Sequence, residues 1–346
     1  MKSILPLHKP VIQHNPANAY LFSIIGNEPD EYAWIMNNFV NMRYNIYTHY
    51  DDFFRNDMWY NCYHITENRF TQEFINQFFD DYFDIVKKLI DMGFYIYLYL
   101  NTRYIPVYNQ ENDCWHNAMI YGYDEDKGII YLADFFNGKS FGTGTCTIDE
   151  FKMAYPYPEK KEGFYYDLWN RAFRKKKDYE FQFNIKELYI KLKDYVEGVD
   201  INAPHYYAFD SNDMEDLEFD HFEEGFDYVY GNRVYDAICT DLIKGDLKVR
   251  SLHLILEFEL LMCKRIRFLE ENGYLKLNSG LYEESEKLYK EAQIIRNLFM
   301  KYDFAGSFNE EKRQRICDKL MLLKEHEKAF IDKLMVALLE HNENLF

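Results

Sequence analysis

Two residues near the middle of the chain have the types and the setting of a proton-transfer pair. His116 begins a β-rich segment, HNAMIYGY, and Asp134 ends the next one, IIYLAD. The residues Asp-Glu-Asp-Lys-Gly at 124–128 favour a turn, so the two segments are predicted to form an antiparallel hairpin. In such a hairpin the start of one strand faces the end of its partner. We therefore expect the Asp134 carboxylate to fix the tautomer of the His116 imidazole and to stabilise its protonated form.

A short helix is predicted upstream of this pair. Prolines punctuate residues 1–16, and the helical pattern begins after them, with Asn18 as the N-cap and Ala19 as the residue that opens the helix. Gly26 is the expected stop. Two further helices are predicted, over 30–42 and, as one long amphipathic helix, over 71–92.

The pattern changes from helix to strand after this second long helix. Residues 94–101 read FYIYLYLN, a β-rich run, and residues 139–146 favour one more strand after the hairpin. Helices followed by an antiparallel sheet indicate the α+β class.

The second half of the chain is predicted to be almost entirely helical. Apolar residues recur at intervals of three and four over the candidate helices 233–242, 251–271, 281–302 and 309–341. We therefore predict a catalytic domain over 1–209, an acidic linker over 210–227 and a helical domain over 228–346, which packs as a bundle and could wall the site or mediate dimerisation. The linker is about half acidic, but its spacing fits no metal-binding loop.

The overall charge limits the class of partner. The formal net charge is −18 at pH 7. Non-specific nucleic-acid binding requires a basic surface, so we expect no nucleic-acid partner, and anionic membrane surfaces are disfavoured too.

The first 15 residues lack the apolar core of a signal peptide, and no segment has the roughly 18 apolar residues of a membrane span. These features predict a cytoplasmic protein.

Cysteine spacing argues against a disulfide framework or a zinc site. The chain has six cysteines, and no two of them form a CxxC pair. This pattern is typical of reduced, structural thiols. The sequence calls for no metal and no organic cofactor.

The hairpin residues and the first helix together resemble the papain-like fold, and more narrowly its bacterial members with an H…GYD…AD hairpin. In that fold a nucleophilic cysteine opens the first helix, and a glutamine six residues earlier donates a hydrogen bond to the oxyanion. The resemblance assigns the nucleophile position to Ala19 and the oxyanion role to Gln13, with His116 and Asp134 as the other catalytic residues. A helix N-terminus and a protonated histidine would both favour a thiolate there.

A closer resemblance covers essentially the whole chain. The order of segments, the run IPVY…H…IYGYD…YLADFF and the helical second half are similar to the butirosin-acyltransferase-like family of papain-fold proteins. The resemblance implies an acyl transfer that forms an amide. A peptidyl or acyl group, which can be thioamidated, leaves a carrier-protein thioester, forms an acyl-enzyme with a cysteine and is transferred to an amine or diamine. The backbone N–H of residue 19 would then help to stabilise the oxyanion.

Alanine at the nucleophile position leaves three interpretations. Ala19 either replaces a cysteine by substitution, which the retention of the other site residues favours, or marks a natural non-catalytic protein that binds acyl groups or peptides. If a cysteine belongs at 19, a hydrolase acting as peptidase, amidase or thioesterase is the rival of the transferase. Cys62, Cys114 and Ser23 are not expected to act as nucleophiles.

Basic clusters at 160–161 and 174–177 either dock an acidic carrier protein or form ordinary solvated surface.

Overall fold

The computed structural model describes residues 1–26, 28–53, 62–136, 140–155, 170–177, 179–199 and 228–342. These residues form two compact units. The first, which we call the sheet unit, contains the described residues of 1–28 and 62–180. The second, the helical unit, contains those of 29–53, 181–199 and 228–342. Strands and helices are both present in quantity, so the α+β class is confirmed.

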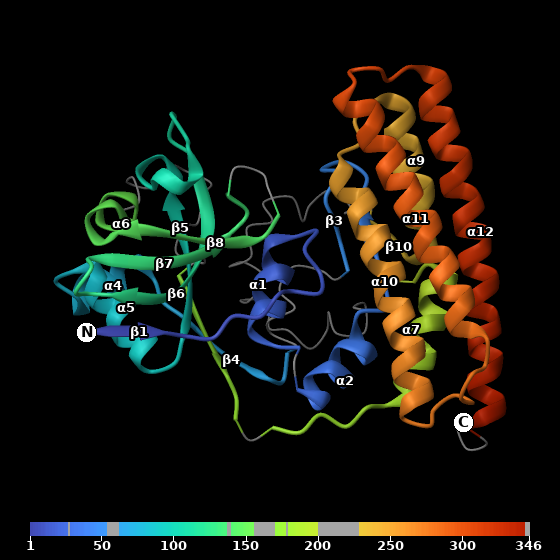
Figure 1. Ribbon diagram of the computed structural model, residues 1–346, viewed down its shortest axis with the longest axis horizontal. Helices are drawn as coiled ribbons and strands as arrows, with labels where there is room; N and C mark the ends of the chain where they lie inside the picture. Colours follow the sequence, from blue (N-terminus) through green and yellow to red (C-terminus); the bar gives the residue numbers. More distant parts are fainter. Residues whose placement is uncertain are drawn as a thin grey trace. The chain divides into compact units, whose positions relative to one another are not determined.

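An antiparallel sheet forms the centre of the sheet unit (Figure 1). Its strands, in spatial order, are β4 (Ile65–Arg69), β9 (Arg171–Lys175), β5 (Tyr95–Asn101), β6 (Trp115–Asp124), β7 (Ile129–Asp134) and β8 (Gly142–Thr147), with β1 (Lys2–Ile4) paired to the far end of β6. The predicted hairpin is confirmed as β6 and β7, and the strands predicted over 94–101 and 139–146 correspond to β5 and β8.

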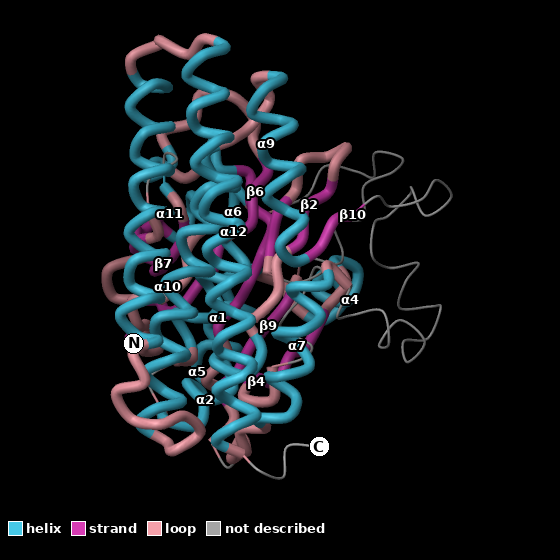
Figure 2. The backbone as a smooth tube through the Cα atoms, turned by 90° about the vertical axis from the view of Figure 1, so that its right-hand side faces the viewer, coloured by secondary structure: helices cyan, strands magenta, loops and turns pink. Residues whose placement is uncertain are grey.

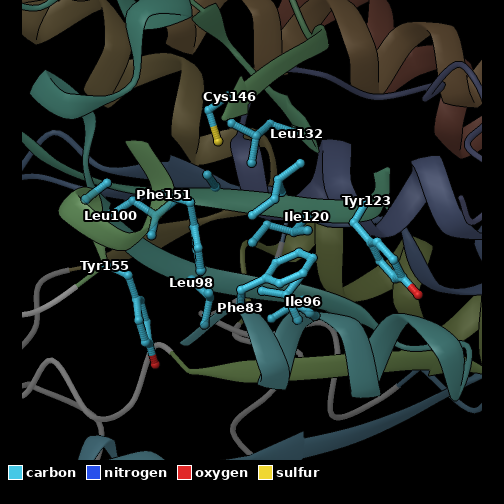
Figure 3. Packing of buried hydrophobic residues seen from close by; sticks show 14 of the residues in the cluster. Phe83, Ile96, Leu98, Leu100, Ile120, Tyr123, Leu132, Cys146, Phe151 and Tyr155 are labelled. Carbon is cyan, nitrogen blue, oxygen red and sulfur yellow. The ribbon is translucent and has the colours of Figure 1, made fainter. Parts of the chain in front are cut away.

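Alternation along β5 explains how this sheet separates its two faces. Ile96, Leu98 and Leu100 belong to a buried cluster with α5 (Tyr82–Asp91) and α6 (Ile148–Ala154). Figure 3 shows these strand residues packed together with Phe83 of α5 and Phe151 of α6. Tyr97 has the opposite parity, and its ring contacts Tyr20 of α1 (Pro16–Ile24) at 5.4 Å between centroids. Because successive side chains of a strand point to opposite faces, α1 and α5 cover opposite faces of the sheet.

The single helix predicted over 71–92 is wrong, because the structure contains two helices there. Helix α4 (Gln72–Phe78) ends before Phe79, which has extended backbone geometry, and α5 begins after Asp81. The Asp81 side chain accepts a hydrogen bond from the Phe83 N–H, 2.8 Å away, and so provides a strong N-cap inside the apolar pattern. Two short 3₁₀ turns, Thr102–Tyr104 and Pro106–Tyr108, follow β5.

The helical unit confirms the four predicted long helices. They are α9 (Val234–Lys244), α10 (Val249–Glu271), α11 (Leu281–Phe304) and α12 (Glu310–His341), and they run side by side in Figure 2. The unit also contains α2 (Pro29–Asn38), α7 (Ile185–Glu197), a 3₁₀ turn (Gly231–Arg233) and a small antiparallel sheet of β10 (Tyr228–Tyr230), β2 (Arg43–Asn45) and β3 (Asp51–Asp52).

The predicted domain boundaries place two segments in the wrong unit. Residues 29–53 and 181–199 belong with the C-terminal helices rather than with the sheet. One reason is Arg265 of α10, a fully buried cation whose guanidinium donates to the carbonyl oxygens of Met36 and Phe39. Another is the pairing of β2 with β10, which joins two parts of the sequence nearly 200 residues apart. The predicted linker 210–227 lies outside the described residues. In the part of the chain that is described, none of the helices could span a membrane.

Candidate active site

The structure brings His116 and Asp134 together in the sheet unit, as the sequence predicts. Nε2 of the imidazole lies 3.1 Å from Oδ2 of Asp134 and 3.3 Å from Oδ1. The carboxylate is fully buried, whereas 37% of the His116 side chain is exposed. A buried anion beside a partly exposed imidazole holds the ring in one orientation and leaves its other edge accessible.

The pair lies where strands β6 and β7 separate. Their pairing runs from Asp124↔Ile129 to Met119↔Ala133. His116 precedes Met119 on β6 and Asp134 follows Ala133 on β7, so both lie just beyond the last pair. Beyond Met119, the carbonyl oxygen of Asn117 accepts a hydrogen bond from the hydroxyl of Tyr20, at 2.9 Å. A side chain of α1 thus satisfies a backbone group of β6 at the point where the strands diverge.

Three further donors converge on the Asp134 carboxylate. The Tyr20 hydroxyl lies 2.6 Å from Oδ1, the backbone N–H of Phe135 donates to the same oxygen at 2.7 Å, and the Tyr108 hydroxyl donates to Oδ2. With His116, they supply donors to both oxygens, as a buried charge requires. Tyr20 and Tyr108 are part of the site, although the sequence did not single them out. Only their positions in the sequence could have identified them, since Tyr20 follows Ala19 and Tyr108 lies in the IPVY run.

Electrostatics in this cluster favour a charged histidine. Burial opposes protonation of His116, but the hydrogen bond and the negative charge of Asp134 outweigh it and raise the pKa of the imidazole above its ordinary value of 6.5. Burial, together with the charge of Asp134, raises the pKa of the Tyr20 and Tyr108 phenols well above 10. Both tyrosines therefore stay neutral and act as donors to the carboxylate.

The ring geometry assigns a role to each nitrogen of His116. Nε2 faces Asp134 and carries the proton of the neutral ring, so Nδ1 presents a lone pair. Nδ1 has no hydrogen-bond partner among the described residues. The Tyr108 ring stands edge-on to the imidazole, with 6.2 Å between the ring centroids. Nδ1 is thus the atom that can accept a proton from a reactant.

The expectation that Ala19 opens the first helix is wrong. Helix α1 begins at Pro16, and Asn15 is its N-cap, with its side chain accepting from the Ala17 N–H at 2.9 Å. The Ala19 N–H already donates to the Asn15 carbonyl oxygen at 3.0 Å, so the predicted oxyanion role of this N–H is not available. Proline suits the first helical position because its missing N–H costs nothing there, and this moves the start one turn upstream of Ala19.

The remaining candidates are placed as follows. The Gln13 side chain donates to the Pro10 carbonyl oxygen at 3.3 Å, a contact within its own loop, and its oxyanion role stays a prediction. Ala19 is fully buried. The Ser23 hydroxyl is buried and donates to the Tyr20 carbonyl oxygen. Cys62 is buried and Cys114 is exposed. No cluster of three metal-ligating residues occurs within the described ranges.

Comparison of the sequence with protein-family models, and with curated proteins, finds no match.

Proposed function

We propose that the sheet unit is a papain-like acyltransferase domain without a nucleophile of its own. It joins an acyl donor to an amine, and His116 acts as the general base. The donor would be an acyl or peptidyl thioester on a carrier protein, and the acceptor an amine. The observation that carries this proposal is the orientation of His116, whose Nε2 faces the buried Asp134 while Nδ1 remains on the accessible side.

The proposed step needs no covalent intermediate with the protein. The amine nitrogen attacks the thioester carbonyl as Nδ1 of His116 accepts its proton, and the imidazolium is stabilised by Asp134. Collapse of the tetrahedral adduct breaks the carbon–sulfur bond, and the imidazolium returns the proton to the departing thiolate. Residues 15–19 read Asn-Pro-Ala-Asn-Ala, so the start of α1 supplies neither thiol nor hydroxyl. This favours direct transfer over an acyl-enzyme.

Hydrolysis of the same thioester is the second candidate, and the exposure of His116 favours it. With 37% of the side chain exposed, water can reach Nδ1 as readily as an amine can. The same base would then activate water, and the product would be a free acid.

The test is a comparison of products from a small acyl thioester, such as an N-acetylcysteamine thioester, with and without a primary amine. We expect amide formation that His116→Gln abolishes. His326→Gln is the matched control, since His326 is also a partly exposed histidine beside a carboxylate, Glu291, but lies in the helical unit. If free acid is the only product even when the amine is present, the hydrolase function is correct and the transferase function is not. No product above the His116→Gln background would remove both and leave a binding protein.

A further inference from the structure

A recessed site that the proposed reaction does not use lies in the sheet unit. It is a pocket of about 870 Å³, within the range of about 300–1,000 Å³ that is typical of small-molecule sites. All of its lining residues belong to the sheet unit. They are Leu5, Pro6, His8, Ile24, Thr66, Asp91, Met92, Gly93, Tyr95, Arg174, Lys175, Lys176, Lys177 and Tyr179.

One wall of the pocket is strongly basic. Four consecutive cations, Arg174 to Lys177, come from the end of β9 and the residues that follow it. Among the described lining residues Asp91 is the one carboxylate, and its Oδ1 accepts from the Tyr123 hydroxyl at 2.8 Å. Arg174, Lys176 and Lys177 form no ion pair with a carboxylate of the described chain. Uncompensated like charges repel one another, so their grouping favours an anion.

The basic wall is held by aromatic and backbone contacts. The Arg174 guanidinium lies over the Phe94 ring, 4.5 Å from its centroid, and the Lys176 ammonium lies 5.9 Å from the centroid of Tyr179. The Lys176 N–H donates to the His64 carbonyl oxygen at 2.8 Å. Tyr179 in turn stacks on Tyr63, with 5.5 Å between centroids. Arg174 and Lys176 therefore each have an aromatic contact without a ligand, which lowers the entropic cost of binding.

Part of the pocket lining is apolar. Leu5, Pro6, Ile24 and Met92 supply this part. The extended segment that carries Leu5 and Pro6 is fixed at both ends, because the Leu5 N–H donates to the Tyr121 carbonyl oxygen and the His8 N–H donates to that of Ser23, each at 2.8 Å. The Tyr95 hydroxyl also donates to the Pro6 carbonyl oxygen. An aliphatic group would thus find a preformed surface beside the cations.

We propose that this pocket binds a small amphiphilic anion, a phosphate or carboxylate head group joined to a short aliphatic stem. The head group would bind at Arg174, Lys176 and Lys177, and the stem against Leu5, Pro6 and Met92. A net charge of −18 repels anions from the molecule as a whole, so retention of an anion requires local cations of this kind. The site is separate in its residues from His116 and Asp134 and does not depend on their chemistry.

Titration calorimetry of the full chain tests this with hexyl phosphate, hexanoate, hexanol and inorganic phosphate. We expect hexyl phosphate or hexanoate to bind at least about tenfold more tightly than hexanol or inorganic phosphate, with affinity falling as salt rises. The stronger of the two amphiphiles identifies the head group. Lys176→Gln combined with Lys177→Gln should weaken that binding about tenfold or more.

The matched control is Lys287→Gln combined with Lys301→Gln, two exposed lysines of α11 in the helical unit. It changes the net charge equally and should leave the affinity unchanged. The circular dichroism melting curve of each variant checks folding. Equal weakening in both double variants, or equal affinity for inorganic phosphate and hexyl phosphate, would overturn the proposal. So would the absence of heat with all four probes, a result that would leave the basic cluster to a macromolecular partner.

Discussion

The hydroxyl of Tyr20 lies between two strands, 2.6 Å from Oδ1 of Asp134 on β7 and 2.9 Å from the carbonyl oxygen of Asn117 on β6. A helix on one face of the sheet is thereby connected to the carboxylate that orients His116. The position of α1 and the geometry of the histidine are mechanically linked through one phenol.

Tyr20→Phe should destabilise the protein without changing the shape of the helix. It removes one donor from a buried carboxylate, so we expect a loss of about 1.5–3 kcal/mol in the free energy of unfolding. Urea denaturation monitored by circular dichroism measures it. Tyr104→Phe is the control, because Tyr104 is 39% exposed and should change stability by less than about 0.5 kcal/mol. Equal effects of the two substitutions would contradict the role of the Tyr20 hydroxyl.

The pH dependence of His116 follows from its raised pKa. Base catalysis requires the neutral ring, so the rate should rise with pH and reach half its maximum above pH 6.5. Asp134→Asn removes the negative charge beside the imidazole, so the midpoint of the pH–rate profile should move to lower pH. The maximal rate should also fall. NMR titration of the His116 ring protons measures the same midpoint without activity. A midpoint at or below 6.5 in the unmodified chain would show that burial outweighs the carboxylate.

The same titration makes a prediction for stability. A histidine with a raised pKa in the folded state stabilises that state fully at pH values below its unfolded pKa, and this contribution is lost as pH rises through the folded pKa. His116→Gln should therefore reduce the melting temperature more at pH 5.5 than at pH 8.5, measured by differential scanning calorimetry. A reduction of equal size at both pH values would mean that protonation of His116 does not stabilise the fold.

Ala19→Cys should not create a nucleophile. The side chain at 19 is fully buried and its N–H is bonded within α1, so a thiol there would meet neither solvent nor an oxyanion donor. Under native conditions we expect iodoacetamide to modify the same number of cysteines as in the unmodified chain, where Cys114 is exposed. Intact-mass measurement counts the modified thiols and also detects any acyl-enzyme formed from a thioester. An additional alkylation, or an acyl adduct that His116→Gln abolishes, would restore the covalent mechanism.

Local patterns predicted most of the long elements. The β-rich run at 94–101 identified β5, the turn at 124–128 identified the hairpin, and recurrence at three and four identified the helices α9 to α12. These signals depend on burial of one face, which a sequence records directly. His116 and Asp134 were predicted to meet for the same reason, because a hairpin has few registers that keep its apolar residues inside.

The errors arose where a single side chain competes with the pattern. Asn15 and Asn18 are both suitable N-caps, and the sequence does not show that Pro16 makes the earlier one the start of α1. Asp81 likewise begins α5 within the single predicted helix. Segments such as β2 pair with residues that are distant in the sequence, and the contact of Tyr20 with Asp134 is likewise long-range. Neither leaves a periodic signal that can be read from one segment.

The helical unit contains a second buried acidic feature, a pair of glutamates in its core. Glu259 of α10 and Glu327 of α12 are fully buried, and Glu327 accepts hydrogen bonds from the hydroxyls of Tyr195 and Tyr235, the latter at 2.6 Å. Burial raises the pKa of Glu259 well above its ordinary value, and the charge of Glu327 raises it further. Because the two tyrosines donate to Glu327, the proton of the pair belongs on Glu259.

Glu259→Gln should therefore stabilise the protein at alkaline pH. A carboxyl whose pKa is raised by folding keeps a proton that the unfolded chain releases, so stability falls as pH increases from about 4.3 towards the folded pKa. Glutamine has no such proton to release and removes this dependence. The melting temperature of the variant should exceed that of the unmodified chain at pH 8.5, and the difference should shrink at pH 5. Glu283→Gln, at an exposed position in the first turn of α11, is the control. A difference between Glu259→Gln and the unmodified chain that stays constant between these pH values would show that Glu259 is charged in the folded protein.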